Sequence, residues 1–280
     1  MRTEKLSTVL GCPIDKIHSV GGGCIGDSVI AKTQYGDIYF VKSYSGKVEM
    51  IKAEYEGLSE LAKASVIRIP EVIYHDSDLL ILEYIEQGIP VKGFWENFGR
   101  AFAHLHQYRS ELYGFTADNF IGSTPQINNQ SEKWTDFFFQ YRIRFQAKLA
   151  VKNGFADSSL LNKIDKLEKI CIPLIDDVNI VPSLLHGDLW SGNYLVDSAG
   201  APVLIDPAVY YGDREADLAM TKLFGSFGSD FYRAYNETFP LLPGYSEREN
   251  LYKLYHILNH LNLFGPGYSS QVNSLINFYL

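Results

Sequence analysis

The segment 186–193, His-Gly-Asp-Leu-Trp-Ser-Gly-Asn, constrains this chain more than any other when it is read together with Asp206. Asp188 and Asn193 stand at its two key positions, with four residues between them. Asp206 directly follows Pro202–Ile205, an apolar run that is typical of a β-strand. A gap the size of a β-hairpin separates the 186–193 segment from Asp206. The fold therefore has to bring one amide and two carboxylates together.

This combination of side chains suits the transfer of a phosphoryl group. Asp188 can accept the proton of an attacking hydroxyl. Asn193 and Asp206 can offer oxygen ligands to Mg²⁺, a hard cation that prefers such donors. The alternative is that Asp188 and Asn193 are ordinary turn residues, since Asp and Asn are common in turns. The rest of the chain favours the functional interpretation.

Length and composition narrow the class of protein. The 280 residues are long for a single core and sufficient for two lobes. A hydrophobic content of 46% and a charged content of 21% indicate a soluble globular protein. A net charge of −8 and a pI of about 5.4 argue against a nucleic-acid surface, which needs clustered Lys and Arg. The N-terminus lacks a signal-peptide pattern, and no apolar run is long enough to suggest a membrane span.

Cysteine and histidine patterns give no sign of a metal centre. The three cysteines are Cys12, Cys24 and Cys171. They form an odd and sparse set without metal-type spacing, which predicts reduced thiols and a cytoplasmic location. His104 and His106 cannot share one face of a helix. His256 and His260 could share a face, but the Glu of a zinc-protease helix is missing.

The first third of the chain is expected to form a small antiparallel sheet with one long helix. Periodicity predicts strands at 16–20, 28–33, 38–42, 72–74 and 79–82. It predicts one helix, at 49–63. A glycine-rich turn, Gly21–Gly26, lies between the first two strands. Gln87–Pro90 then reads as a hinge.

Beyond the hinge the pattern becomes mostly helical. Helices are expected at 95–108, 133–151, 158–171, 214–224, 229–238, 246–263 and 269–279, with a β-like interruption around 184–206. The arrangement resembles the α+β protein-kinase-like fold. It implies an N-terminal nucleotide-binding lobe at 1–86 and a larger, mainly helical catalytic and substrate-binding lobe at 87–280.

Lys42 ends a strand that follows the glycine-rich turn. In kinase-type sites a Lys at this place binds the nucleotide phosphates and pairs with a Glu of the next helix. Glu54 is the best candidate for that partner. Helical geometry leaves Glu49 open, whereas Glu56 points elsewhere. The alternative is that Lys42 and Glu54 are solvated surface charges.

The motifs resemble those of the fructosamine kinase family, the ketosamine-3-kinases, within a wider group that includes aminoglycoside and choline phosphotransferases. The matching stretches are GGGCIG (21–26), FVK (40–42), NFIGSTPQ (119–126), WTDFF (134–138), HGDLWSGN (186–193), LIDP (204–207), GDREADLAM (212–220) and LNHLNLFGPGY (258–268). HGDLWSGN together with the block at 204–220 is specific to this family. The H-G-D-x4-N pattern alone marks only the wider group.

The resemblance implies roles for five residues. Asp188 is the catalytic base, and Asn193 and Asp206 bind Mg²⁺. Lys42 and Glu54 form the ion pair that holds the nucleotide phosphates. The metal motif reads Asp-Pro-Ala and not Asp-Phe-Gly, so an inactive state driven by a Phe flip is not expected.

The nucleotide site is expected to include backbone from two further regions. The resemblance places Gly22, Gly23 and Cys24 over the nucleotide, where missing Cβ atoms let backbone N–H groups approach phosphates. The loop lacks the lysine of a P-loop, and a plain hairpin turn is the alternative. Glu83 and Ile85, just before the hinge, are also assigned to the cofactor site.

Three residues have open roles. Trp190 is either a core anchor or a platform for a sugar or an amine, because tryptophan serves both purposes. Glu215 is assigned to the substrate amine, with bracing of the following helix as the alternative. For Asp217 bracing is favoured, since acids near a helix start are stabilised there.

The resemblance implies an ATP- and Mg²⁺-dependent kinase that phosphorylates the sugar of ketosamines, such as fructosamine or ribulosamine adducts of amines and lysines. The 3-hydroxyl would be the acceptor, and its phosphorylation would start deglycation. The expected partners are small ketosamines and glycated proteins, and the net negative charge suits cationic amines. The alternatives are an aminoglycoside- or choline-type phosphotransferase and an inactive nucleotide-binding regulator. Every catalytic motif is intact, which argues against the inactive regulator.

Cys24 adds a hypothesis about regulation. A thiol among glycines, near backbone N–H groups and Lys42, would favour the reactive thiolate. Its oxidation to an intermolecular disulfide would convert a monomer into a redox-sensitive dimer and lower activity. The alternative is a buried, inert cysteine.

Overall fold

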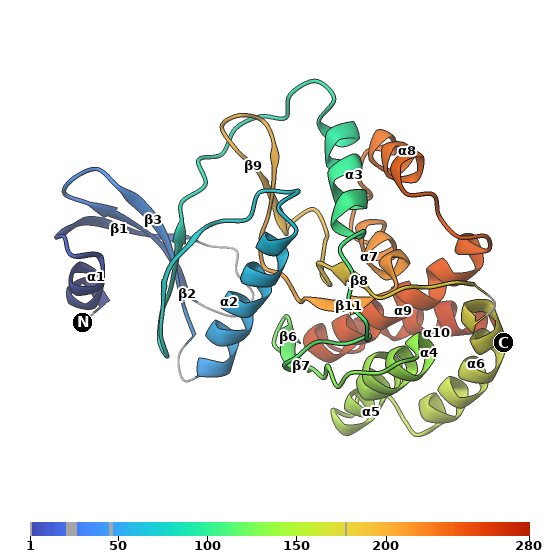
Figure 1. Ribbon diagram of the computed structural model, residues 1–280. Helices are drawn as coiled ribbons and strands as arrows, with labels where there is room; N and C mark the ends of the chain where they lie inside the picture. The colour runs from blue at the N-terminus through green and yellow to red at the C-terminus, as the bar shows by residue number, and fades with distance from the viewer. Residues whose placement is uncertain (1, 21–26, 45–46, 177) are drawn as a thin grey trace.

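The structure is a computed structural model that describes residues 2–20, 27–44, 47–176 and 178–280. It shows a small lobe built on one sheet and a larger helical lobe, with the N-terminus at the outer edge of the first (Figure 1). The segment after the sheet passes from one lobe to the other. The small sheet and the many helices agree with the expected two-lobe α+β fold.

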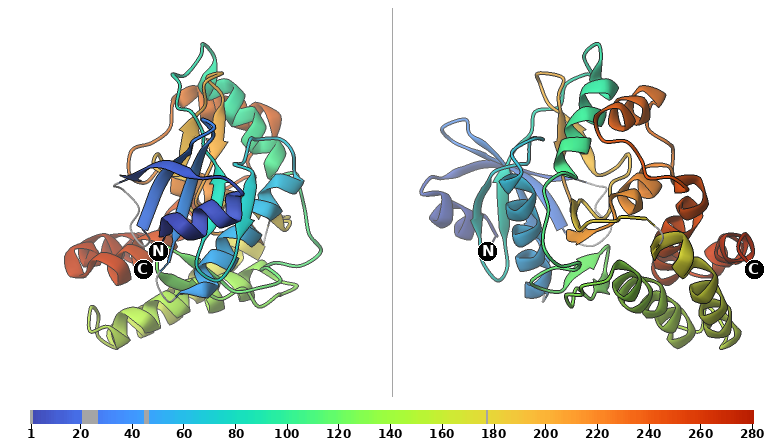
Figure 2. Two further views of the ribbon diagram at one scale, coloured as in Figure 1. Left: turned by 90° about the vertical axis from the view of Figure 1, so that its left-hand side faces the viewer. Right: turned by 45° about the vertical axis from the view of Figure 1, so that its right-hand side comes forward.

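The sheet of the small lobe has five antiparallel strands in the order β1-β2-β3-β5-β4. The elements of the small lobe are α1 (Arg2–Leu10), β1 (Ile14–Val20), β2 (Asp27–Thr33), β3 (Ile38–Ser43), α2 (Val48–Lys63), β4 (Val72–His75) and β5 (Leu80–Glu83). β3 therefore lies in the middle of the sheet. Figure 2 shows α1 lying against this sheet.

Alternation along the strands gives the sheet two different faces. Val41 and Ile81, which oppose each other on β3 and β5, belong to the cluster that α1 covers with Leu6. The next residues along β5, Leu80 and Leu82, pack instead with α2 residues. Each strand thus contributes alternate side chains to two separate layers.

Gly57 sets how closely α2 approaches the other lobe. A Cβ at this position would lie 3.1 Å from Cγ of Pro207 and 3.5 Å from Cγ2 of Val209. Gly57 lies one turn after Glu54, on the buried face of α2. The helix can therefore rest on the segment that follows Asp206, which a larger side chain would prevent.

Hydrogen bonds and an ion pair join the two lobes near the hinge. Arg68 donates from Nη1 to Asp197 at 2.7 Å and forms an ion pair with Glu83 through Nη2. The backbone N–H of Gly88 donates to the carbonyl of Val196 at 2.9 Å. The end of the sheet is therefore held against the β9–β10 hairpin of the large lobe (Tyr194–Val196 and Pro202–Leu204).

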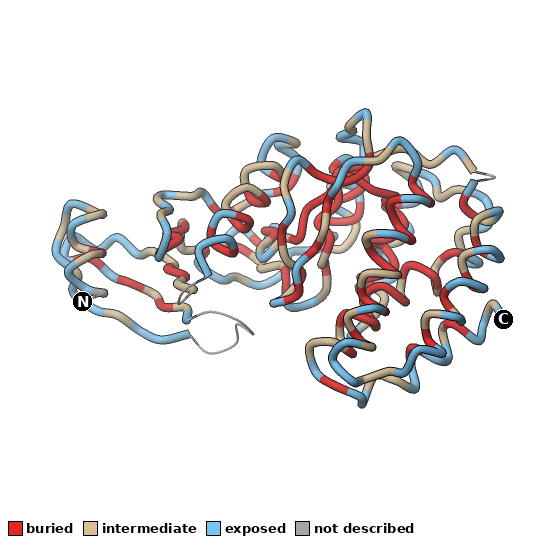
Figure 3. The backbone as a smooth tube through the Cα atoms, turned by 90° about the horizontal axis from the view of Figure 1, so that it is seen from below, coloured by how far each residue is buried: buried red, intermediate tan, exposed pale blue. Residues whose placement is uncertain are grey.

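The large lobe is a bundle whose longest helix is α9 (Tyr245–Phe264). The remaining elements are α3 (Phe94–Leu105), β6 (Asn119–Ile121), β7 (Thr124–Gln126), α4 (Trp134–Phe137), η1 (Phe138–Arg144), α5 (Phe145–Lys152), α6 (Ser159–Asp176), β8 (Ser183–Leu185), β11 (Tyr210–Gly212), α7 (Arg214–Thr221), α8 (Ser229–Thr238), η2 (Pro266–Tyr268) and α10 (Ser269–Asn277). α9 contacts α5, α6, α7 and α10. Figure 3 shows buried residues throughout the interior of the molecule and exposed ones along its outer surface. Buried residues of α9 belong to the main hydrophobic core of the large lobe.

The structure differs from the predicted elements in several places. A short β6–β7 hairpin stands where no strand was expected, because its buried positions are mostly polar residues, Asn119, Thr124 and Gln126, which give no hydrophobic alternation. The single helix expected at 133–151 has a π-helical middle, η1. α6 continues to Asp176 past Pro173, beyond the expected end. Among the described helices, none combines the length and apolarity that crossing a membrane requires.

We predict that Gly57→Val destabilises the protein. The branched side chain would overpack the contact between α2 and Pro207. The free energy of unfolding, measured in urea, should fall by about 1–3 kcal/mol. The control is Ala62→Val on the exposed face of α2, where the cost should stay near the helix-propensity difference of under about 1 kcal/mol. Equal losses in both variants would contradict the close contact.

Candidate active site

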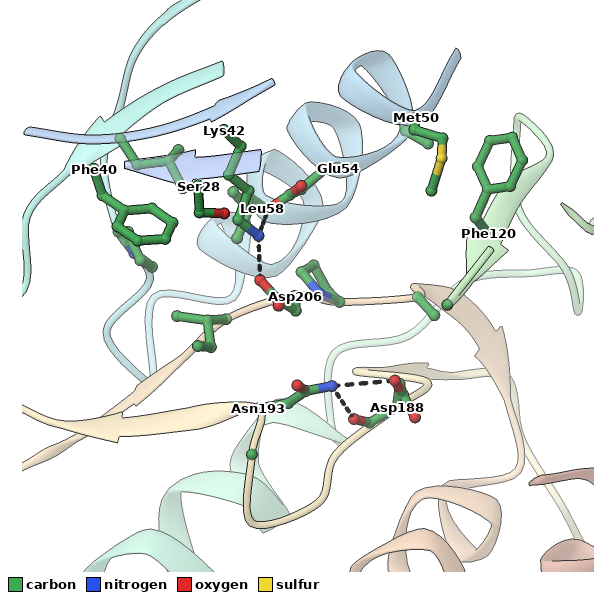
Figure 4. A pocket seen from close by; sticks show the side chains of 18 of the residues that line it. Ser28, Phe40, Lys42, Met50, Glu54, Leu58, Phe120, Asp188, Asn193 and Asp206 are labelled. Atoms are coloured by element: carbon green, nitrogen blue, oxygen red, sulfur yellow. Dashed lines mark hydrogen bonds and ion pairs between the residues drawn. The ribbon is translucent and has the colours of Figure 1, made fainter. Parts of the chain in front are cut away.

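A cavity of about 600 Å³ lies between the lobes. The small lobe contributes β3, α2 and the end of β5 to its wall. The large lobe contributes the 186–193 loop, the segment after β10 and the end of α9. This size falls within the usual range for small-molecule sites. Figure 4 shows the charged residues of its interior.

Lys42 reaches the cavity because of the alternation along β3. Lys42 pairs with Leu80 in the sheet, so its side chain belongs to the face that α2 covers. Its Nζ lies 2.5 Å from Oε1 of Glu54 and forms a second ion pair with Asp206. Glu49, the other candidate partner, is exposed. Glu54 is thus the residue that pairs with Lys42 (Figure 4).

The electrostatics of this cluster keep Lys42 charged. Burial by itself lowers the pKa of the ammonium group, but the carboxylates of Glu54 and Asp206 outweigh that effect and raise it above the ordinary value. Burial also raises the pKa of Glu54, against the opposite influence of Lys42. Tyr44 donates its hydroxyl to Oε2 of Glu54 at 2.7 Å. The second oxygen of Glu54 is therefore also satisfied.

Asn193 fixes Asp188 within the loop. Its Nδ2 donates to the backbone carbonyl of Asp188 at 2.8 Å and to Oδ2 of the same residue at 3.1 Å (Figure 4). Burial, followed by the nearby carboxylate of Asp206, raises the pKa of Asp188 well above its ordinary value, and the bond from Asn193 only partly opposes this. The carboxylate is therefore a stronger base than one in water.

Asp217 binds the backbone at the start of the 186–193 loop. Its carboxylate accepts the N–H of His186 at 2.7 Å and that of Gly187 at 2.8 Å. His106 lies 3.3 Å from the same carboxylate. The sequence favours a role for Asp217 in bracing the helix near whose start it lies, and the structure shows a different contact. Asp217 braces the loop before Asp188, whereas the helix α7 is capped by Asp213.

Gly187 is required by the conformation of this loop. It has a φ of +82°, and a Cβ there would lie 1.9 Å from the carbonyl oxygen of Ala208. Side chains other than hydrogen are excluded on both counts. The loop and the segment after Asp206 therefore run in direct backbone contact, and Ala208 N–H donates to the carbonyl of His186 at 2.8 Å.

The donor set suits a Mg²⁺ ion that takes only part of its ligands from the protein. It does not suit a site in which protein groups alone surround the ion. Asn193 uses its amide nitrogen on Asp188, which leaves the amide oxygen available, and 44% of the Asp206 side chain is exposed. Across the described part of the chain no three His, Cys, Asp or Glu side chains gather into a metal cluster. Mg²⁺ commonly takes one or two protein oxygens and completes its shell with phosphate and water.

The predicted nucleotide-binding residues are only partly described. Glu83 and Ile85 both line the cavity. Gly22, Gly23 and Cys24 lie outside the described residues, and so does the redox hypothesis for Cys24. Of the other cysteines, Cys12 is half-buried and Cys171 is buried.

Trp190 lines the cavity and is not part of the hydrophobic core. Its ring covers Gly192, where a Cβ would lie 2.5 Å from the indole. It also packs edge to face with Phe224, with 6.4 Å between the ring centroids. Of the two roles considered for Trp190, the platform for a sugar or an amine agrees better with this position than the core anchor does.

The assignment of Glu215 to the substrate was wrong. The residue is fully buried, and its two oxygens accept from Nε and Nη2 of Arg248 at 2.8 and 2.9 Å. It does not line the cavity. A buried carboxylate needs a cation, and α9 supplies one, so Glu215 braces α7 against α9.

Sequence reasoning missed four polar residues that support the site. They are Tyr44, His106, Asn119 and Gln126. The last two begin and end NFIGSTPQ, a stretch noted only for its resemblance. No local signal marks these residues: Tyr44 acts on the helix that follows it, and the other three act on segments that are distant in the chain.

Comparisons with known proteins agree with the geometry. A family model described as fructosamine kinase matches residues 2–280. A probable ketoamine kinase of Synechocystis sp. is 41% identical over 285 residues, which cover 98% of this chain and 94% of the relative. The chloroplastic protein-ribulosamine 3-kinase of Arabidopsis thaliana is 41% identical over 274 residues, which cover 95% of this chain and 83% of the relative.

Solved structures extend the comparison to the fold. A crystal structure from Haemophilus somnus, provisionally assigned as a fructosamine-3-kinase, matches with a TM-score of 0.89 at 28% identity and covers 100% of this chain and 96% of that one. The ternary complex of APH(2″)-IIa with streptomycin and ATP matches with a TM-score of 0.67 at 15% identity and covers 98% and 94%. The second likeness concerns the fold alone, and it confirms the kinase-like two-lobe architecture.

We predict that Glu215→Gln destabilises the protein because it leaves Arg248 buried without its counter-charge. Breaking such a pair costs about 3–5 kcal/mol in the free energy of unfolding, measurable in urea. Glu237→Gln removes the same charge from an exposed pair with Arg233 and should cost under about 1 kcal/mol. A stable Glu215→Gln variant with altered ligand binding would restore the substrate role.

Proposed function

Because this chain belongs to the fructosamine kinase family, we propose that it transfers the γ-phosphoryl group of ATP to a sugar hydroxyl of ketosamines. One observation carries this proposal: Lys42, Asp188, Asn193 and Asp206 meet in one cavity between the lobes. These are the residue types that a phosphotransferase needs for phosphate, acceptor and metal.

The acceptor follows from the relatives. Two relatives at 41% identity are named ketoamine kinase and protein-ribulosamine 3-kinase. We propose the 3-hydroxyl of a ketosamine sugar as acceptor, with deglycation of the amine as the outcome. The cavity wall reaches Phe264, which is 55% exposed, so its mouth opens at the surface. A ketosamine on the lysine of a protein could therefore enter as well as a free one.

The nucleotide is proposed to lie against the small lobe. Lys42, held by Glu54, would bind its phosphates, and Glu83 and Ile85 would border its base. The APH(2″)-IIa complex, which shares the fold, contains ATP. In this proposal residues 1–86 form the nucleotide lobe and 87–280 the catalytic lobe.

Mg²⁺ would be held by the amide oxygen of Asn193 and the carboxylate of Asp206, and when bound it neutralises charge on the phosphates. Asp188 accepts the proton of the attacking hydroxyl, and its raised pKa suits that task. Asn193 orients this carboxylate through Nδ2. Trp190 forms a wall beside the acceptor.

Location and assembly remain proposals from the sequence. We propose a cytoplasmic enzyme that acts as a monomer or as a dimer controlled by the redox state of Cys24. The sparse cysteines support the reducing location.

The deciding experiment is a coupled ADP-release assay with a panel of fructosamine and ribulosamine adducts, aminoglycosides and choline. Turnover of the ketosamines, with none of the other acceptors, is the expected result. Turnover of aminoglycosides or choline alone would favour the wider phosphotransferase group. Nucleotide binding without turnover of any acceptor would favour an inactive regulator.

We predict that Asp188→Asn lowers turnover by about 10²–10⁴-fold, the usual weight of a general base. The substitution keeps the shape of the side chain and removes the proton acceptor, so ATP affinity should change little. Steady-state kinetics and calorimetric ATP titration measure the two quantities. Retention of more than about a tenth of wild-type turnover would exclude Asp188 as the base.

We predict that Asp206→Ala loses Mg²⁺-dependent ATP binding, whereas Asp188→Asn keeps it. Only the first substitution removes a proposed metal ligand. Lys42→Met should depress turnover and also lower the free energy of unfolding, because the substitution leaves the buried carboxylate of Glu54 without its cation. Calorimetry with and without Mg²⁺ separates the cases. Tight Mg·ATP binding by Asp206→Ala would contradict its role.

A further inference from the structure

Asp206 has an unusual backbone conformation. Its φ is +54°, in the left-handed region that L-residues with side chains rarely adopt. It also precedes Pro207, and residues before proline favour extended backbone. Such a conformation persists only where the surroundings hold it. The residues on either side of Asp206 therefore need fixed positions.

The catalytic loop holds the segment before Asp206. The N–H of Ile205 donates to the carbonyl of Asn193 at 3.1 Å. The carbonyl of Ile205 accepts from Nε2 of His186 at 2.9 Å. Nδ1 of the same ring accepts the N–H of Asp188 at 3.2 Å, so one neutral tautomer satisfies both bonds.

The β6–β7 hairpin holds the segment after Asp206. Gln126, at the end of β7, donates from Nε2 to the carbonyl of Ala208 at 3.0 Å. Asn119, at the start of β6, donates from Nδ2 to the carbonyl of Val209 at 2.7 Å. Two consecutive carbonyls are thus bound by two side chains of one hairpin.

The two amides are themselves fixed by buried partners. Gln126 also donates from Nε2 to Oδ1 of Asn119 at 2.7 Å, and its Oε1 accepts the hydroxyl of Tyr255 at 2.5 Å. Asn128 donates to Oδ1 of Asn119 at 3.0 Å. All four side chains are at least 95% buried. Such a connected network allows one arrangement, because any other leaves a buried polar atom unpaired.

The clamped segment also touches the small lobe. Pro207 and Val209 lie under Gly57 of α2, one turn from Glu54. β6 contacts α2 as well. The hairpin consequently sets the distance between the carboxylates of Glu54 and Asp206, which Lys42 bridges.

We propose that Asn119 and Gln126 are positioning residues that keep Asp206 in its left-handed conformation, with its carboxylate directed at the metal and at Lys42. The inference rests on the proposed function, because it assumes that Asp206 binds Mg²⁺. Partners of this kind, which act through a metal ligand, typically contribute about 10–100-fold to metal affinity.

The test uses Gln126→Met, which keeps the length of the side chain and removes both donors. The control is Thr221→Val, an isosteric change at a 1% exposed residue that loses its hydrogen bond to the carbonyl of Leu218. Mn²⁺ is titrated into each protein with ADP present, and bound metal is read by electron paramagnetic resonance. Hydrogen exchange of the peptide that contains residues 205–209 reports on the clamp itself.

For Gln126→Met we expect Mn²⁺ affinity to fall by about 10–100-fold and exchange at 205–209 to rise. ADP binding without metal should stay within about twofold of wild type, since the substitution leaves Lys42 and Glu54 in place. Thr221→Val should match wild type in all three measurements. A merely structural amide would lower stability without this selective loss of metal affinity.

Tyr255→Phe removes only the hydroxyl that orients Gln126 and gives a milder second variant. It should show a smaller change in the same direction, and it serves if Gln126→Met does not fold. Wild-type Mn²⁺ affinity in a folded Gln126→Met or in Tyr255→Phe would overturn the proposal. So would an equal loss in Thr221→Val. Absence of Mn²⁺·ADP binding in the wild-type protein would refute the proposed nucleotide site and this inference with it.

Discussion

The whole site depends on one buried cation shared by two carboxylates. Lys42 stands on the central strand of the small lobe, Glu54 on the helix that covers it, and Asp206 on the large lobe. The buried carboxylate of Glu54 could not face this cavity at low cost without the ammonium group, since uncompensated buried charge is strongly destabilising. The cluster therefore serves as an electrostatic joint between the lobes. Its members are also the groups that would hold phosphate and metal.

Around this cluster, specific hydrogen bonds hold the backbone segments on either side of the candidate site. Asp217 accepts two backbone N–H groups of the loop, and Gln126 and Asn119 donate to two carbonyls beyond Asp206. These bonds offset the left-handed backbone of Asp206. The candidate catalytic groups thus stand on loops that specific hydrogen bonds hold in place, which catalytic geometry requires.

The arrangement also suggests how nucleotide would enter the site. Lys42 already contacts Asp206, so arriving phosphates and Mg²⁺ would exchange partners with charges that are in place. The carboxylate would turn to the metal and the ammonium to the phosphates. No new charge would have to be buried alone, which keeps the cost of binding low.

Much of this could be predicted from the sequence, for a local reason. HGDLWSGN and the strand before Asp206 are contiguous patterns, and hydrophobic periodicity separates sheet from helices. Alternation along β3 is likewise local, so the choice of Lys42 followed from its place at the strand end. Resemblance across nearly the whole chain then supplied the chemistry.

Local sequence patterns could not identify the partners of these residues. Glu54 could be preferred over Glu49 but not separated from it, because only the packing of α2 on the sheet decides which face turns inward. Glu215 was misassigned because its partner, Arg248, is brought to it by the helix α9. Asn119 and Gln126 look like turn residues until the chain brings Ala208 and Val209 beside them. The sequence by itself determined the chemical groups and the elements that bear them. Their hydrogen bonds join segments far apart in the chain, so the tertiary structure alone decided which group each one meets.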